Sequence, residues 1–167
     1  MKYKWALVPL AALVAVGLYV GNVLATPAGG QSTTTLGKAL AVPPVALFGH
    51  AKQPGGGWRA RVHTHGFSDL YVIDNTFTPG GTTGWHSHAG PSLIFVVAGQ
   101  ITNYLGDDPN CTPHVYSAGQ SFTDAGGSDV HMLRNNGTVN AETIAVQFLP
   151  KDAVRRIDEP DPLNCHF

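Results

Sequence analysis

The chain has 167 residues, of which 13% are charged, and its formal net charge at pH 7 is −1. This length suits one domain with a sizeable core and is short for two domains. The small net charge gives no basic field for nucleic acid, so nucleic acid is excluded as an expected partner. Twenty Gly and twelve Pro between short apolar runs predict an all-β chain with many turns and exclude long helices.

The N-terminal segment has the composition of an export signal. Two lysines precede an uncharged apolar run, residues 5–20, which ends in small residues before Thr26. We predict a signal peptide over residues 1–25, cleaved after Ala25, which places the domain outside the cytoplasm, either secreted or in the cell envelope. The alternative is an uncleaved signal anchor, because residues 5–25 are about long enough to span a bilayer. That anchor would be the only membrane contact.

Two regions follow the export segment. Residues 26–57 are rich in Gly, Thr, Ser and Pro, which indicates an extended arm or linker with one edge strand near residues 45–48. From Trp58 the pattern changes to short strands between turn residues, which predicts a β-barrel over residues 58–150. The predicted strands cover residues 58–65, 69–77, 85–88, 92–97, 101–105, 114–116, 120–123, 130–134 and 142–149.

Two local patterns within the barrel give specific expectations. The segment Asn135-Asn136-Gly137 is typical of a tight type I′ hairpin turn between the last two strands. The strand at residues 92–97 is largely apolar on both faces, which predicts a strand that is buried on both sides. Its apolar side chains would also exclude water from a pocket next to it.

The two cysteines predict a disulfide. Cys111 lies in a turn-like segment and Cys165 in a polar, Pro-rich tail, residues 151–167, so that neither is expected in the core. In an oxidising compartment the pair most simply forms a bridge that tethers the tail to the barrel. On the chain-entropy model such a bridge stabilises the fold by about 4 kcal/mol. Two metal-binding thiols are the weaker alternative, because the cysteines lie far apart and lack a CxxC partner.

Two histidine pairs share the pattern His-x-His. Side chains at positions i and i+2 of a strand point to the same face, so His86 and His88 have the spacing of metal ligands. His63 and His65 have the same spacing, but nothing downstream of them matches a ligand arrangement. We therefore expect the second pair to be surface imidazoles.

The context of the first pair resembles a known family. Gly80, five residues, His86-Ser87-His88, three residues, Ser92, six residues and Gly99 resemble the first signature of the cupin family. A glutamate normally stands in that family where Ser92 stands in this chain.

The segment from Gly119 to Asn135 is similar to the second cupin signature. Ala125 replaces a proline and one extra residue precedes His131, while the spacing from His131 to Asn135 is intact. The resemblance covers about residues 58–150 and implies a small antiparallel jelly-roll β-barrel with a site in its mouth. It implies His86, His88 and His131 as the metal ligands, and it implies a possible homodimer.

No glutamate between Trp58 and Ala141 can replace the missing ligand. Asp69, Asp74, Asp124 and Asp129 are conceivable substitutes, although Asp124 and Asp129 are better explained as solvated residues of the loop and turn before His131. Ser92 either holds a water or fills space, and strand parity places Arg134 on the opposite face from His131. The residues that could support the ligands are Ser92, Tyr71 and Tyr104.

Three neutral imidazoles leave up to three positions open on an octahedral divalent ion. Fe, Mn, Ni, Cu and Zn all accept imidazole, and Fe(II) is favoured. With Fe(II), the resemblance implies a dioxygenase-like oxidation of a small organic molecule, which we favour over hydrolysis at Zn(II). A cupin barrel can also serve as a non-catalytic extracytoplasmic module that binds a small molecule or a metal. A barrel whose histidines bind nothing is the third hypothesis.

Overall fold

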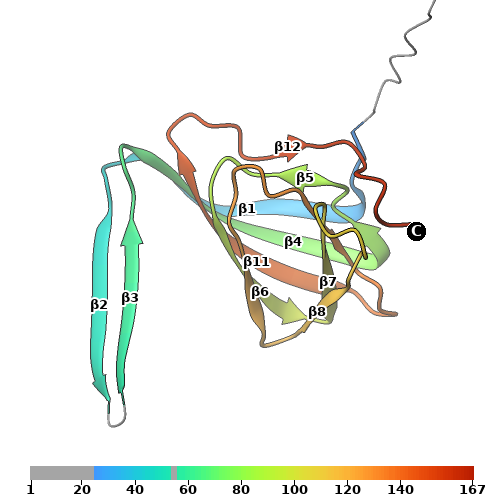
Figure 1. Ribbon diagram of the computed structural model, residues 1–167, viewed down its shortest axis with the longest axis horizontal. Coiled ribbons are helices and arrows are strands. Elements are labelled where there is room, and N and C mark those ends of the chain that lie inside the picture. Colours follow the sequence, from blue (N-terminus) through green and yellow to red (C-terminus); the bar gives the residue numbers. More distant parts are fainter. Residues whose placement is uncertain (1–24, 54–55) are drawn as a thin grey trace, which may run out of the picture.

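The computed structural model describes residues 25–53 and 56–167, and the predicted export segment, apart from Ala25, lies outside them. All the regular structure in this part of the chain is β-strand (Figure 1). None of these residues forms a helix that is long and apolar enough to cross a membrane. The predicted all-β fold, a small antiparallel jelly-roll barrel, is confirmed.

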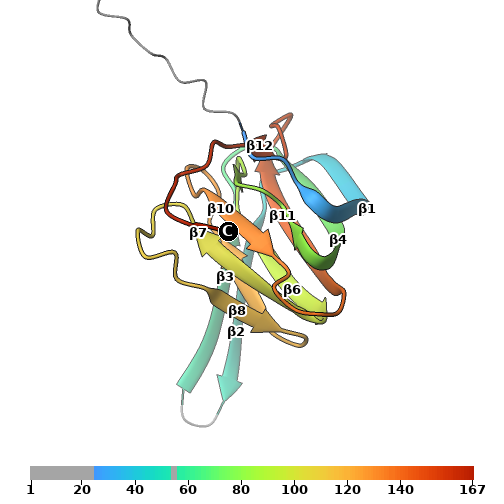
Figure 2. The ribbon, with the colours of Figure 1, turned by 90° about the vertical axis from the view of Figure 1, so that its right-hand side faces the viewer.

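Ten strands form two antiparallel layers that meet where Arg134 of β10 pairs with Thr82 of β4. Figure 2 shows β10, β7 and β8 of the second layer beside one another. The first layer, in spatial order, consists of β1 (Gly29–Val42), β4 (Ser68–Thr82), β11 (Ala141–Pro150), β6 (Ser92–Ala98) and β9 (Ser121–Asp124). The second consists of β12 (Ile157–Asp158), β5 (His86–Ser87), β10 (His131–Arg134), β7 (Gln100–Leu105) and β8 (His114–Ser117).

Strict alternation along the strands builds the interior. Every second residue of β11 is buried, so one face of this strand packs inward and the other faces outward. The same alternation on the neighbouring strands brings large apolar side chains together between the layers. This core contains Ile73, Phe77, Ile94, Val96, Ile101, Phe122, Leu133, Ala141 and Ala145.

The N-terminal region differs from the predicted arm. Gly29–Val42 forms the 14-residue strand β1, which pairs along the length of β4. It is a mostly exposed edge strand, which explains why its Thr-rich sequence carries no alternating apolar pattern. β2 (Ala46–Gln53) and β3 (Gly56–His63) form a separate hairpin that stands away from the barrel (Figure 1). The predicted strand at residues 58–65 therefore does not belong to the barrel sheet.

The predicted hairpin turn at Asn135 is wrong. β10 pairs with β4, β5 and β7, whereas β11 pairs with β4 and β6, so the chain crosses between the layers at this point. Asn135 is fully buried, and its Nδ2 donates to the carbonyl oxygens of Phe77 and Val139. The Asn-Asn-Gly sequence thus lies in a loop that crosses between the two layers, and the buried side-chain amide of Asn135 stabilises this loop.

The prediction for β6 is half right. Its inward residues Ser92, Ile94 and Val96 are buried, but the outer face lies open. Leu93, Phe95 and Val97 are 39%, 40% and 48% exposed. Composition alone does not separate a strand covered on both sides from one that presents an apolar outer face.

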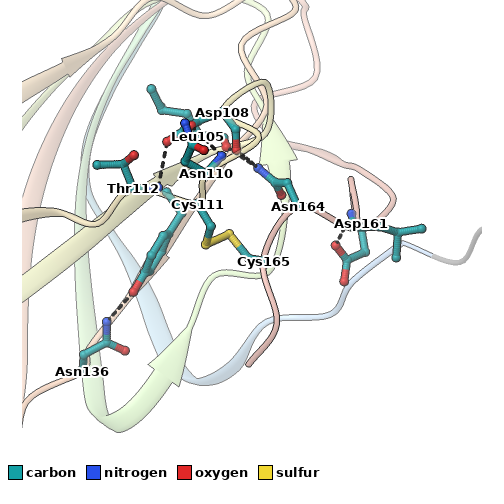
Figure 3. Close-up of a disulfide and its surroundings, with 11 residues drawn as sticks. Leu105, Asp108, Asn110, Cys111, Thr112, Asn136, Asp161, Asn164 and Cys165 are labelled. Carbon is teal, nitrogen blue, oxygen red and sulfur yellow. Dashed lines mark hydrogen bonds between the residues drawn. A yellow bond between two sulfur atoms is a disulfide. The ribbon is translucent and has the colours of Figure 1, made fainter.

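The predicted disulfide between Cys111 and Cys165 is present, with 5.2 Å between the Cα atoms (Figure 3). Beside it, Asn164 Nδ2 donates to the carbonyl oxygens of Leu105 and Asp108. Earlier in the tail, β12 pairs with β5. The tail is therefore fastened at both ends, next to the strand that carries His86.

Candidate metal centre

The three predicted histidines come together at the mouth of the barrel. His86 on β5 is the cross-strand partner of His131 on β10, and their ring centroids are 4.3 Å apart. His88 follows two residues after His86, so it faces the same side. One nitrogen from each ring lies within 4.8 Å of the others, and all three residues are buried.

Local sequence orients the first motif. Trp85 precedes His86 and points to the other face, where it packs with Tyr104, Met132 and Cys165 under the tail. The backbone of His88, at the end of this motif, is held by a hydrogen bond, because Gly127 N donates to the carbonyl oxygen of His88 at 2.7 Å.

The loop before His131 requires a glycine at Gly126. Its φ is +72°, and a Cβ at this position would collide with the backbone of Gly90. Glycine thus lets the two motif loops touch.

Each imidazole is oriented by a backbone carbonyl. Nδ1 of His86 lies 3.0 Å from Gly84 O, and Nδ1 of His88 lies 2.7 Å from Arg155 O. Nδ1 of His131 lies 3.3 Å from the carbonyl oxygen of Asp129. A carbonyl oxygen only accepts, so these contacts favour the tautomer in which Nδ1 carries the hydrogen and Nε2 keeps its lone pair. Ligands held in this way are typical of histidine metal sites.

Burial favours the neutral form of all three rings. Desolvation is the largest cause that lowers the pKa of each, and the neighbouring histidines lower the pKa of His86 and His88 further. Asp124 acts in the opposite direction on His88 and His131. The balance leaves the pKa of each ring below its usual value of 6.5, so the rings present lone pairs at neutral pH.

Asp124 corrects the sequence-based expectation. It is only 6% exposed, not a solvated turn residue, and its carboxylate faces two of the histidines. Its Oδ2 lies 3.9 Å from Nε2 of His88, and its Oδ1 lies 3.9 Å from Nδ1 of His131. Asp124 is the cross-strand partner of Ser92, the position of the missing glutamate. A carboxylate thus reaches the site from the adjacent strand.

Ser92 belongs to a polar row that crosses four strands. Tyr71, Gln147, Ser92 and Asp124 are successive cross-strand partners on β4, β11, β6 and β9. Gln147 Nε2 donates to Ser92 Oγ at 3.2 Å, and Ser92 Oγ donates to Asp124 Oδ2 at 3.3 Å. Ser92 therefore positions Asp124 and fixes Gln147, and it does more than fill space.

A cavity of about 250 Å³ opens beside the histidines. Inward residues of β4, β6, β10 and β11 line it, and β1 closes one side with Gln31 and Thr33, both of which donate to Asn75 Oδ1. Apolar side chains such as Ile94 and Ala145 lie between polar ends. The segment predicted to be an arm thus contributes to the cavity wall.

Three further residues of the cavity wall carry no sequence motif. Arg155 and Arg156 line it from the loop before β12, and Thr143 lines it from β11. Thr143 Oγ1 is buried and has no hydrogen-bond partner among the described residues. A sequence pattern could not identify these residues, because their place depends on how the tail folds back and on strand register.

The other candidate residues take structural roles. Tyr71 adjoins Gln147 in the polar row without lining the cavity. Tyr104 does not reach the cavity, since it packs near the disulfide and its hydroxyl accepts from Asn136 Nδ2. Arg134 is stacked over Phe167, away from the cavity, in agreement with its parity. Asp69 accepts from the backbone N–H groups of Ala41 and Asp152, which lower its pKa.

The remaining acidic residues do not supply a ligand. Asp129 is exposed and contributes its carbonyl oxygen to His131. Asp74 is half-buried on β4 and does not line the cavity.

His63 and His65 stay apart from the site. Their rings meet edge to face, 4.7 Å between centroids, at the base of the projecting hairpin, and both residues are exposed. Within residues 25–53 and 56–167, the one cluster of three possible metal ligands is that of His86, His88 and His131.

An antiparallel jelly roll with inward-facing histidines at its mouth is a double-stranded β-helix of the cupin type. A protein-family model described as Cupin domain matches residues 75–147, the segment that contains all three histidines. Over these residues the chain is similar to the cupin family, and its fold agrees with that similarity.

Several solved structures are similar to this chain. The polyketide cyclase RemF from Streptomyces resistomycificus superposes with a TM-score of 0.52 at 14% identity, over 84% of this chain and 81% of that one. An uncharacterised protein with a double-stranded β-helix domain from Klebsiella pneumoniae subsp. pneumoniae MGH 78578 is 20% identical, with a TM-score of 0.46, over 55% of this chain and 70% of that one.

An oxalate oxidase is 20% identical with a TM-score of 0.45, over 53% of this chain. The chain spans 45% of the length of that oxalate oxidase. No curated protein matches the chain.

Proposed function

We propose that this protein binds one divalent metal ion through His86, His88 and His131 and uses it to oxidise a small organic molecule with O₂, as a dioxygenase does. The observation that carries the proposal is the set of three neutral imidazoles whose Nδ1 atoms all face backbone carbonyls. Each ring is thereby oriented and leaves one lone pair for a ligand bond.

The residues present fit such an ion. Three buried nitrogen donors at one end of a cavity leave an octahedral ion with positions that the protein does not fill. Imidazole accepts Fe, Mn, Ni, Cu and Zn, and we favour Fe(II) because it supplies redox chemistry with O₂ when bound. The cavity beside the histidines supports a substrate of small size.

Asp124 takes the charge role of the absent glutamate in this proposal. Three neutral ligands leave the ion's two positive charges uncompensated, and Asp124 is the carboxylate that faces the histidines. Ser92 holds it by a hydrogen bond. A carboxylate adjacent to the ligands, and not one among them, preserves open positions on the ion while it lowers the cost of holding the charge.

The decisive experiment joins metal content with O₂ uptake. The protein, purified without a metal-affinity tag, is expected to hold metal, and the Fe(II)-loaded form is expected to consume O₂ with one member of a panel of small diketones, thiols and phenols. His86→Ala should abolish both properties. Bound zinc, with hydrolysis and no O₂ uptake by the iron-loaded form, would contradict the oxidative part of the proposal.

A non-catalytic binding module is the second candidate. The replacement of the ligand glutamate by Ser92 and the hydrogen-bonded polar row next to the cavity favour it. It predicts stoichiometric metal and saturable binding of a small molecule without turnover for any metal loaded. Turnover that disappears in His86→Ala would exclude it.

Export to an oxidising compartment completes the proposal. The disulfide between Cys111 and Cys165 supports it. Mass spectrometry of the exported protein is expected to find a new terminus at Thr26, whereas a terminus at Met1 would favour the anchor. Thiol labelling without reductant should leave both cysteines unmodified, and ready labelling would contradict the oxidised state in the cell.

A further inference from the structure

Arg155 occupies a distinctive position in the cavity wall. It lies between β11 and β12, is half-buried, and lines the same cavity as the three histidines. Its backbone carbonyl takes the Nδ1–H of His88. Its guanidinium donates from Nη1 to Gln147 Oε1 at 3.3 Å. The peptide unit and side chain of one residue thus touch both the metal centre and the polar row.

The charge of Arg155 is not balanced by a neighbouring carboxylate. Within the described ranges, no carboxylate oxygen lies within 4.0 Å of its guanidinium nitrogens. The adjacent Arg156 is different, because it pairs with Asp158 at 2.6 Å and donates to Thr83 O at 2.6 Å. A guanidinium remains charged at neutral pH, so half-buried Arg155 offers the cavity a cation that no carboxylate of the described residues neutralises.

A second observation points to a polar ligand in the same cavity. Thr143 Oγ1 is fully buried, lines the cavity and has no partner among the described residues. A buried hydroxyl without a partner is costly. Between Thr143 and the Arg155 end of the cavity lies the apolar side chain of Ala145, so the wall alternates between charged, apolar and polar surfaces.

The size and shape of the site limit the ligand. A cavity of about 250 Å³ suits a small organic molecule. The guanidinium is a planar fork that matches the two oxygens of a carboxylate. Arg156 also lines the cavity but is paired with Asp158, so one guanidinium of the cavity wall is without a carboxylate partner among the described residues, which suits a carboxylate better than a phosphate dianion.

We propose that the substrate or ligand of this cavity is a small organic carboxylate whose carboxylate pairs with Arg155 and whose body extends past Ala145 toward Thr143. Its placement beside the metal rests on the proposed function, but the ion pair with Arg155 does not require the metal. Arg155 is then the residue that selects acids over neutral analogues.

The test compares acids with their amides. Binding of benzoate, benzamide, phenylacetate and phenylacetamide is measured by calorimetry and by backbone amide NMR shifts on the full-length protein, both metal-free and zinc-loaded. We expect each acid to bind about 10- to 100-fold more tightly than its amide in both forms, because a hydrogen-bonded charge pair replaces a neutral contact. Arg155→Gln should remove this preference, and Arg155→Lys should retain part of it.

Arg134→Gln is the matched control, because Arg134 lies outside the cavity and its removal should leave the preference unchanged. Thermal melts of each variant verify that the fold persists. Equal binding of acids and amides by the wild type, or a preference that persists in folded Arg155→Gln, would overturn the proposal even if metal is bound. Acid binding that depends on Arg155 in a protein that takes up no metal would support it while refuting the metal centre.

Discussion

The two His-x-His pairs of this chain have nearly the same internal geometry and very different surroundings. The ring centroids are 4.7 Å apart for His63 and His65 and 4.9 Å apart for His86 and His88, edge to face in both pairs. The first pair is exposed at the base of a hairpin, whereas the second is buried with His131 opposite it. Spacing along the chain thus brings two histidines side by side, but a third possible metal ligand is added only by the pairing of β5 with β10.

The difference lies in what each pair's neighbours supply. The rings of His86 and His88 face the carbonyl oxygens of Gly84 and Arg155, and a third imidazole comes from β10. β3, which ends at His63, pairs only with β2, so no third ligand of the described chain reaches the outer pair. Three predictions test whether this contrast determines metal binding, and one tests the burial of the three inner histidines.

The largest effect is expected from removing a ligand. His131→Ala should weaken metal affinity by more than about 100-fold, because even partners that only support ligands are worth about 10- to 100-fold. His65→Ala should leave the affinity unchanged. Titration of both variants with Co²⁺, followed by its absorption spectrum, measures the contrast, and equal losses in the two variants would refute it.

Removal of the adjacent carboxylate should have the next largest effect. Asp124→Asn keeps the shape of the side chain but takes away its charge, so we expect a loss of about 10- to 100-fold in metal affinity. Asp129→Asn is the control, since Asp129 is exposed and meets His131 only through its backbone. If Asp124→Asn binds metal as the wild type does, Asp124 plays no part in balancing the ion.

Acid should destabilise the metal-free protein through the buried histidines. Their folded-state pKa values lie below 6.5, so between those values and 6.5 the unfolded chain binds more protons than the folded chain. Their contribution is complete above pH 6.5 and is lost as the pH falls, at up to about 1.4 kcal/mol per pH unit for each histidine. Urea unfolding from pH 8 to 5 measures the slope. A His86→Gln/His131→Gln variant should show a shallower one, and an unchanged slope would contradict this origin.

The smallest effect on metal affinity is expected from deleting His63 and His65 together with the β2–β3 hairpin. Val42 and Ser68 are register partners, so a short Gly-Ser loop can replace residues 44–65. Metal affinity should stay within about twofold of the wild type, because none of the hairpin residues that the structure describes lines the cavity. A loss of metal on deletion would show that the hairpin supports the site.

Sequence patterns were sufficient for the local parts of the site. Alternation placed His86 and His88 on one face, motif spacing identified His131, and the two cysteines were paired correctly. The all-β fold followed from short apolar runs between turn residues. These features depend on residues close in sequence or on a motif with fixed spacing.

What could not be predicted depends on register and on long-range packing. Asp124 lies 32 residues from Ser92 and faces it only through the pairing of β6 with β9. The Thr-rich sequence of β1 gave no sign that this strand forms part of the cavity wall. Arg155 reaches the same wall only because the C-terminal tail folds back over the barrel. The hairpin turn predicted at Asn135 was wrong because the same Asn-Asn-Gly sequence can form a loop between layers, in which the amide of Asn135 is buried.

Anomalous diffraction from crystals of the metal-loaded protein tests the central claim most directly. We expect one peak per chain, about 2.0 to 2.2 Å from a nitrogen of each of His86, His88 and His131, at the bond lengths usual for imidazole ligands. No peak should lie between His63 and His65. A protein that shows no peak at the three histidines after loading, or one whose peak lies at the outer pair, would contradict the account.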